Sequence, residues 1–133
     1  MPSHFRTWAA YRKAFILSDR IDEVSGSFPS DEKFRLTDQI RRSSSSVCAN
    51  LGESFGKRRY PKHFVSKITD AAGENYETQV WLDKALTRKY ISRKEYDGLN
   101  ELSNEVARLL TYMEHNPSHY ANKIFKSKNE VKP

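Results

Sequence analysis

Basic side chains gather in the second quarter of the chain, where seven cations could contact phosphate. Guanidinium groups bind phosphate oxygens bidentately, and the counterions released on binding make the affinity fall with salt. Phe55, Tyr60 and His63 lie among these cations, and their rings could stack on unpaired bases. The pattern predicts a nucleic-acid-binding surface formed by Arg35, Arg41, Arg42, Lys57, Arg58, Arg59 and Lys62.

Part of this basic segment also has a structural interpretation that needs no ligand. Positive side chains near the carboxyl end of a helix interact favourably with its dipole. Lys57, Arg58 and Arg59 are expected at such an end. The sequence leaves both interpretations open.

Arg42 is a candidate for a buried ion pair. On a helical wheel it shares one flank of the predicted second helix with Glu53, and Glu77 of the third helix could approach that flank. A buried arginine needs a carboxylate partner, because an unpaired interior charge is strongly destabilising. We therefore expect a network that joins Arg41 or Arg42 to Glu53 or Glu77, at a contact between helices or between subunits.

Two faces of the helix expected around residues 40–56 lack the charged side chains of a solvated surface. The first is the expected core face: Leu36, Ile40, Ser43, Val47, Asn50, Leu51 and Ser54. The second consists of small residues: Ser45, Cys48, Ala49 and Gly52. Small residues are poor choices for a solvated helix face. We expect this helix to pack on both sides, with another subunit as the second neighbour; the alternative is a Ser-rich surface without a partner.

Polar residues on the predicted core faces are expected to bond to one another. Ser43 and Asn50 of the second helix would pair with Asn75 and Thr78 of the third, because buried polar groups need partners. These residues include no nucleophile–base pair of recognisable spacing. The sequence therefore predicts no catalytic residue and no cofactor.

Cysteine and histidine point to no metal site. Cys48 is the single cysteine and has no nearby histidine, so we expect a small buried residue in a reducing compartment. His115 and His119 have the spacing of helical metal ligands, but Pro117 lies between them. No metal site is predicted.

The composition favours one domain with a polyanionic partner. The chain has 133 residues, a length typical of a single domain, and a net charge of +6. Residues 31–62 carry +4 and residues 117–133 carry +3, an asymmetry that favours nucleic acid. No apolar run approaches the roughly 20 residues of a membrane span, and the first residues lack a signal-peptide core. We expect a cytoplasmic protein with no membrane association.

Helix-start and helix-stop signals divide the chain into four helices. Gly26 and Pro117 mark helix ends, and Pro61 suits a first turn. Ser92 and Glu95 have the spacing of a capping box. The predicted helices span residues 4–24, 30–57, 61–89 and 92–116.

Long helices joined by short loops are expected to pack as antiparallel neighbours. The predicted fold is all-α, an antiparallel up-down four-helix bundle over residues 1–116, followed by a basic, flexible tail over residues 117–133. The predicted core faces are Phe5, Trp8, Ala9, Phe15 and Ile16 in the first helix, Phe64, Ile68, Ala71, Asn75, Thr78 and Leu82 in the third, and Leu99, Leu102, Val106, Leu109 and Met113 in the fourth.

Several short motifs resemble a known family. Phe28-Pro29, Glu32-Lys33-Phe34, Leu36 and Gln39-Ile40-Arg41-Arg42-Ser43 are similar to a signature of the four-helix-bundle proteins encoded in intervening sequences of bacterial 23S ribosomal RNA genes. Asn50-Leu51-Gly52-Glu53-Ser54-Phe55-Gly56 resembles a second block of that family, and Ala71, Gly73, Glu77 and Leu82 resemble a third. Trp8 resembles an early Val-Trp pair. Gly52, Ser54 and Glu74 depart from the family pattern.

This resemblance implies a ring-like homopentamer without established enzymatic activity. The same fold is shared by the accessory protein of diversity-generating retroelements, which binds a reverse transcriptase and its template RNA. The resemblance therefore favours a non-enzymatic, oligomeric protein that binds RNA rather than DNA. The alternative is a protein–protein adaptor that docks a reverse transcriptase, and an enzyme has the least support.

Overall fold

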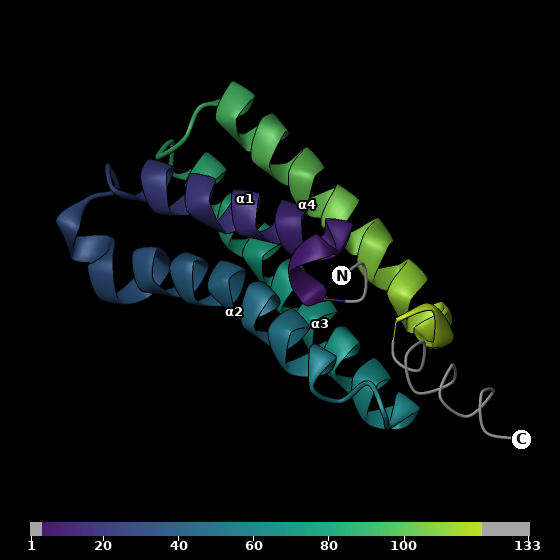
Figure 1. Ribbon diagram of the computed structural model, residues 1–133. Coiled ribbons are helices and arrows are strands. Elements are labelled where there is room, and N and C mark those ends of the chain that lie inside the picture. Colours follow the sequence, from purple (N-terminus) through teal and green to yellow (C-terminus); the bar gives the residue numbers. More distant parts are fainter. Residues whose placement is uncertain (1–3, 121–133) are drawn as a thin grey trace, which may run out of the picture.

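The computed structural model describes residues 4–120, which form an all-helical fold without any strand (Figure 1). Four α-helices make up this part of the chain: α1 (Ala9–Ser25), α2 (Asp38–Phe55), α3 (Pro61–Thr87) and α4 (Arg93–His115). Short helical turns adjoin them: the 3-10 turns η1 (Phe5–Thr7), η2 (Ser30–Glu32) and η4 (Pro117–His119), and the π-helical turn η3 (Lys33–Thr37). The prediction of an all-α fold with four helices is confirmed.

The four α-helices enclose a common core, because α1 and α3 each pack against both α2 and α4. The core consists of two clusters, one around Trp8 and Phe64 and the other around Leu17 and Leu82. Every residue of the core face predicted for α3 is buried. The face predicted for α4 is also buried except for Leu109, which is only partly covered.

The first helix begins later, and buries a different face, than the sequence predicted. After η1 the backbone is extended at Trp8, with φ −71° and ψ 134°, and α1 starts at Ala9. Trp8 is buried, and its ring meets the Phe64 ring edge-to-face at 6.2 Å. A helical wheel that includes Trp8 is therefore out of phase, and Phe15 and Ile16 are 54% and 45% exposed. The buried residues of α1 are Ala10, Ala14, Leu17, Ser18, Ile21 and Ser25.

The segment predicted as the start of the second helix is helical but not regular α-helix. It consists of η2 and η3, and α2 itself begins only at Asp38. The π-helical turn accommodates two successive buried residues, Leu36 and Thr37, while Phe34 is 79% exposed. Such turns are uncommon and often occur at functional sites.

The other predicted helix ends agree with the structure to within two residues. α3 begins at Pro61 and ends at Thr87. At the start of α4, the Glu95 amide donates to Ser92 Oγ at 3.0 Å and the Ser92 amide donates to Glu95 Oε1 at 2.8 Å. This reciprocal pair is the predicted capping box.

The expected C-terminal tail is packed at its beginning. η4 follows α4, and the Tyr120 ring lies 5.4 Å from the Trp8 ring and 6.3 Å from the Phe64 ring. Residues 121–133, and with them most of the predicted tail, lie outside the described residues. No helix within residues 4–120 has the length and hydropathy to span a membrane.

Candidate nucleic-acid interface

The seven cations predicted to bind phosphate lie at three places along α2 and do not form one patch. Arg35 precedes the helix in η3, Arg41 and Arg42 lie in its first turns, and the other four follow its end. Because α2 has 18 residues, it separates Arg35 from Lys57 by roughly 27 Å at about 1.5 Å per residue. The cations at the three places therefore have different neighbours.

Arg41 holds α2 against the end of α1. Its Nε donates to Ser25 Oγ at 2.7 Å, and its Nη2 donates to the carbonyl oxygen of Asp22 at 3.1 Å. These acceptors lie in the last turn of α1, where a cation also interacts favourably with the helix dipole. The contacts give Arg41 a structural role within one chain.

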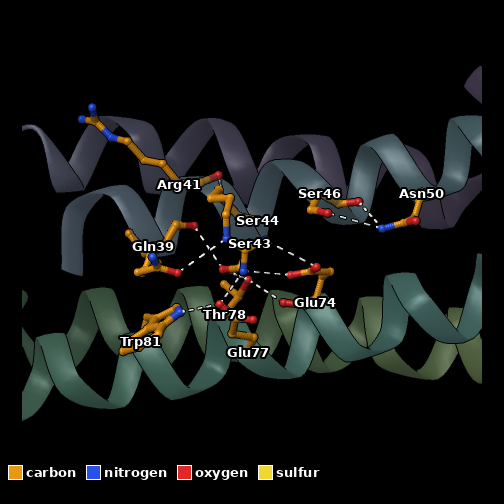
Figure 2. A network of polar contacts seen from close by, with 12 residues as sticks. Gln39, Arg41, Ser43, Ser44, Ser46, Asn50, Glu74, Glu77, Thr78 and Trp81 are labelled. Atoms are coloured by element: carbon orange, nitrogen blue, oxygen red, sulfur yellow. Dashed lines mark hydrogen bonds and ion pairs between the residues drawn. The ribbon is translucent and has the colours of Figure 1, made fainter. Parts of the chain in front are cut away.

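Arg42 bridges α2 to two carboxylates of α3. Its Nη2 lies 2.5 Å from Glu77 Oε2 and 3.2 Å from Glu74 Oε1. The Trp81 indole also donates to Glu77 Oε2, at 3.0 Å. Figure 2 shows these carboxylates reaching from α3 toward α2, with Trp81 at one end of the network and Gln39 facing it. The expected approach of Glu77 to Arg42 is present in the structure, and Glu74 joins it. The expectation of a buried arginine is wrong, because the Arg42 side chain is 48% exposed at the edge of the α2–α3 contact.

The Arg42 network shifts the pKa values of its members. Hydrogen bonds to Glu77 and then Glu74 raise the pKa of Arg42. The hydrogen bond from Trp81, and then that from Arg42, hold the pKa of Glu77 below its ordinary value, against the opposing effect of burial. Arg42 and Glu77 are therefore both charged at neutral pH and form an ion pair.

Glu53, the other expected partner of an arginine, pairs with a lysine of α3 instead. Lys67 Nζ lies 2.6 Å from Glu53 Oε1. Asn50, which the sequence placed in the core, is only half-buried: it donates to the Ser46 carbonyl oxygen at 2.9 Å and accepts from Lys67 at 3.5 Å. Both residues lie at the margin of the α2–α3 contact, because α2 turns them toward solvent.

The buried polar residues are paired, but only partly between the helices expected. Ser43 and Thr78 share a hydrogen bond of 2.8 Å between α2 and α3. Asn75 faces α4 rather than α2: it donates to the Ser103 carbonyl oxygen at 3.0 Å and accepts from Ser103 Oγ at 2.9 Å. Buried polar residues of α3 therefore form hydrogen bonds with both α2 and α4.

The small-residue face of α2 is covered in part by the same chain. Ser45 Oγ lies 3.4 Å from Ser18 Oγ of α1, and a Cβ at Gly52 would lie 3.9 Å from the Phe5 ring of η1. Cys48 packs against the first core cluster, and this burial raises the pKa of its thiol to about 11. Ala49 is exposed. The chain's own α1 and η1 thus supply much of the second neighbour that the sequence led us to expect from another subunit.

The connection between α2 and α3 presents the remaining cations. Lys57 and Lys62 are exposed, and so is Arg59. Arg58 is different: its Nε donates to the Phe55 carbonyl oxygen at 3.0 Å, and its guanidinium lies 3.7 Å from the Phe55 ring centroid. Desolvation lowers the pKa of this guanidinium. Arg58 therefore orders the connection, while the others face outward.

Cations from the first residues of the chain join the same end of the molecule. The His4 ring lies 4.8 Å from the Phe55 ring, and Arg6 lies 4.7 Å from the Phe5 ring centroid. Arg12 donates to the Thr7 carbonyl oxygen at 3.0 Å. Sequence reasoning missed this contribution because only the turn at η1 brings these residues beside the end of α2. We call the resulting surface the basic end: Arg6, Arg12, Lys57, Arg58, Arg59 and Lys62.

Comparison with known proteins finds a matching family model and similar solved structures. The family model described as "23S rRNA-intervening sequence protein" matches residues 6–112. Among solved structures, the chain is similar to a Bacteroides thetaiotaomicron protein of unknown function from the S23 ribosomal protein family. The two are 27% identical with a TM-score of 0.71, over 80% of this chain and 95% of the other. No curated protein matches this chain significantly in sequence.

Proposed function

This chain belongs to the 23S rRNA-intervening sequence protein family, and on that premise we propose that it binds RNA through its basic end without catalysing a reaction. The observation that carries this proposal is the exposure of Lys57, Arg59 and Lys62 around one connection, beside Arg6 and Arg12 of the first turns. Exposed cations can contact phosphate and release its counterions. Tyr60, 54% exposed, adds a ring on which a base can stack.

Further cations follow the described part of the chain in the sequence. Tyr120 packs on Trp8 and Phe64, close to the start of α3. The sequence continues from that point with Lys123, Lys126, Lys128 and Lys132. These lysines lie outside the described residues, and their positive charge would add to the attraction of the chain for a polyanion.

Acidic groups keep the proposed interface away from the middle of the α2–α3 contact. Along the outer side of the α2–α3 contact, a hollow of about 340 Å³ is lined by Asp70, Glu74 and Glu77. Arg42 is the only cation bound to the last two within the described residues. Carboxylates repel phosphate, so RNA would contact the basic end and not follow the middle of α2.

We also propose that the bundle is antiparallel and assembles as a homopentameric ring in the cytoplasm. The contact of Arg41 near the start of α2 with Asp22 near the end of α1 supports opposite directions for these helices. In a ring, the basic end would be presented five times, and avidity would strengthen individually weak contacts. The half-exposed Tyr76 and Val80 of α3 support an interface between subunits.

Titration of the full chain with structured RNA and duplex DNA, at low and physiological salt, tests the RNA proposal. Lys57→Ala with Lys62→Ala should weaken RNA binding and reduce the salt slope by about one unit for each lost phosphate contact. Arg20→Ala with Lys94→Ala removes the same charge from exposed positions in α1 and α4. Equal effects of the two double variants would show that only net charge matters, which would contradict a defined interface.

A protein–protein adaptor, such as one that docks a reverse transcriptase, is the second candidate function. Its support is the exposure of large apolar side chains on separate elements, with Phe34 79% and Phe15 54% exposed. Absence of RNA binding at low salt, together with tight binding to a co-expressed reverse transcriptase, would favour the adaptor. In that case Phe34→Ser should weaken the complex while Lys57→Ala leaves it unchanged.

A further inference from the structure

A cavity of about 250 Å³ lies between the turns η2 and η3 and the last turns of α3, at the opposite end of α2 from the basic end. Its volume is just below the usual range for small-molecule sites. Two segments far apart in sequence form its wall, with a carboxylate, an amide, an indole and three cations. These groups are Glu32, Arg35, Gln39, Trp81, Lys84 and Arg88.

Glu32 is the unusual member of this set, because it is an acidic residue that is only 6% exposed. Its Oε2 accepts from the Tyr90 hydroxyl at 2.7 Å and from Arg88 at 3.4 Å. Its Oε1 is buried and has no partner among the described residues. The Tyr90 hydrogen bond, and then the charges of Arg88 and Arg35, lower the pKa of Glu32, although burial opposes them. The nearby Leu36 amide also lowers this pKa, so the carboxylate is ionised at neutral pH, and its Oε1 is the atom without a full hydrogen bond within the described residues.

The cations of the cavity are not all neutralised by Glu32. Arg88 pairs with it, but neither Arg35 nor Lys84 forms an ion pair with a described residue. Each of these two side chains is exposed and comes from a different wall, Arg35 from η3 and Lys84 from α3. Two cations that form no ion pair within the described residues, beside an ionised carboxylate, suit a ligand that has an anionic group and, separately, an N–H donor.

Trp81 supplies an aromatic wall that is held in place. Its indole nitrogen donates a hydrogen bond to Glu77, and Glu77 is held in turn by its ion pair with Arg42. Figure 2 shows Trp81 and Gln39 on facing helices at the end of this network. An indole in a fixed position beside cations is a surface on which a nucleobase can stack.

We infer that this cavity binds one unpaired nucleotide of the RNA, with the base against Trp81, a base N–H donating to Glu32, and a phosphate between Arg35 and Lys84. The inference rests on the proposed RNA binding and adds to it a second contact point, distant from the basic end. A bare phosphate fits less well, because it would bring negative charge toward the ionised Glu32. A base can lie flat against the Trp81 ring only when it is unpaired and unstacked from its neighbours.

Tryptophan fluorescence of the full chain, titrated with the four ribonucleoside monophosphates and with inorganic phosphate, tests this inference. The chain has two tryptophans, and Trp8 is buried in the other core cluster, so Trp81 should report binding. We expect quenching by nucleotides that Trp81→Phe abolishes. Arg35→Ala and Lys84→Ala should each weaken nucleotide binding about tenfold, as expected for one lost charge-assisted contact. Lys94→Ala, which removes an exposed charge of α4 outside both the cavity and the basic end, should leave nucleotide binding unchanged.

Glu32→Gln keeps the shape of the side chain and should also weaken nucleotide binding, but it removes a buried charge and can impair folding. Arg35→Ala and Lys84→Ala alter exposed side chains and keep the test valid in that case. No quenching at millimolar nucleotide would overturn the inference, and so would equal binding of inorganic phosphate. RNA affinity that falls with Lys57→Ala but not with Arg35→Ala would overturn the cavity and leave the proposed function standing. Nucleotide quenching without any RNA binding would support the cavity and overturn the proposed function.

Discussion

Glu77 accepts hydrogen bonds from Arg42 of α2 and from Trp81 of its own helix. Glu77→Ala should lower the free energy of unfolding at neutral pH by about 1–2 kcal/mol, a value reduced for the partial exposure of the ion pair. Urea denaturation followed by circular dichroism measures this change. Glu101→Ala, which removes an exposed ion pair with Arg108, should cost less than about 0.5 kcal/mol.

The effect of Glu77→Ala should also depend on pH, in a direction set by the lowered pKa of this carboxyl. A carboxyl whose pKa is lower in the folded state stabilises the fold above its unfolded pKa, here 4.5. That contribution is lost as the pH falls below 4.5 toward the folded value. The difference between the wild type and Glu77→Ala should therefore shrink between neutral and acidic pH. A difference of equal size at both pH values would show that Glu77 acts by packing and not by charge.

At the scale of the element, η1 approaches α2 at a small residue in the last turn of that helix, Gly52. Glycine within a helix costs about 0.5–1 kcal/mol relative to alanine. A Cβ at Gly52 would be at an ordinary contact distance of 3.9 Å from the Phe5 ring. Gly52→Ala should therefore raise the free energy of unfolding by about that amount, which thermal denaturation can measure.

Larger side chains at position 52 should lower the free energy of unfolding instead of raising it. Gly52→Leu would displace the Phe5 ring and uncover part of the first core cluster, so it should lower the melting temperature. Gly98→Ala in α4, where a Cβ would meet no atom within 4 Å, is the control for helix propensity alone. Equal gains from Gly98→Ala and Gly52→Leu would show that η1 does not pack on α2 in solution.

Local signals predicted the helices well, whereas they failed where tertiary contacts decide the backbone. The capping box at Ser92, the proline at position 61 and the regular stripes of α3 and α4 act within one or two turns, so the sequence reveals them. The extended backbone at Trp8 and the π-helical turn η3 depend instead on burial of distant side chains. Periodicity alone could not have indicated either feature.

At the scale of the whole molecule, the candidate site was less predictable than the fold. Arg35 and Lys57 belong to the same basic segment of the sequence, but they lie at opposite ends of α2. The cavity combines Glu32 with Arg88, which are 56 residues apart and show no common motif. The internal partners of Arg41 and Arg42 likewise come from two other helices. Whether a cation stabilises the fold or is available to RNA depends on the residues that pack beside it, and these come from distant parts of the sequence.

The proposed ring makes a prediction about the mass of the protein in solution. A subunit interface has to cover apolar side chains that one chain leaves exposed. Tyr76 and Val80 are 52% and 51% exposed one turn apart on α3, near Gly73, where a neighbour could approach closely. Native mass spectrometry should give five times the mass of one chain. Tyr76→Glu with Val80→Glu should shift the protein to a smaller species by placing charge in the interface, whereas Lys57→Ala with Lys62→Ala should not. A monomeric wild type, or a double Glu variant that keeps the full mass, would contradict this arrangement and leave the basic end to act from a single copy.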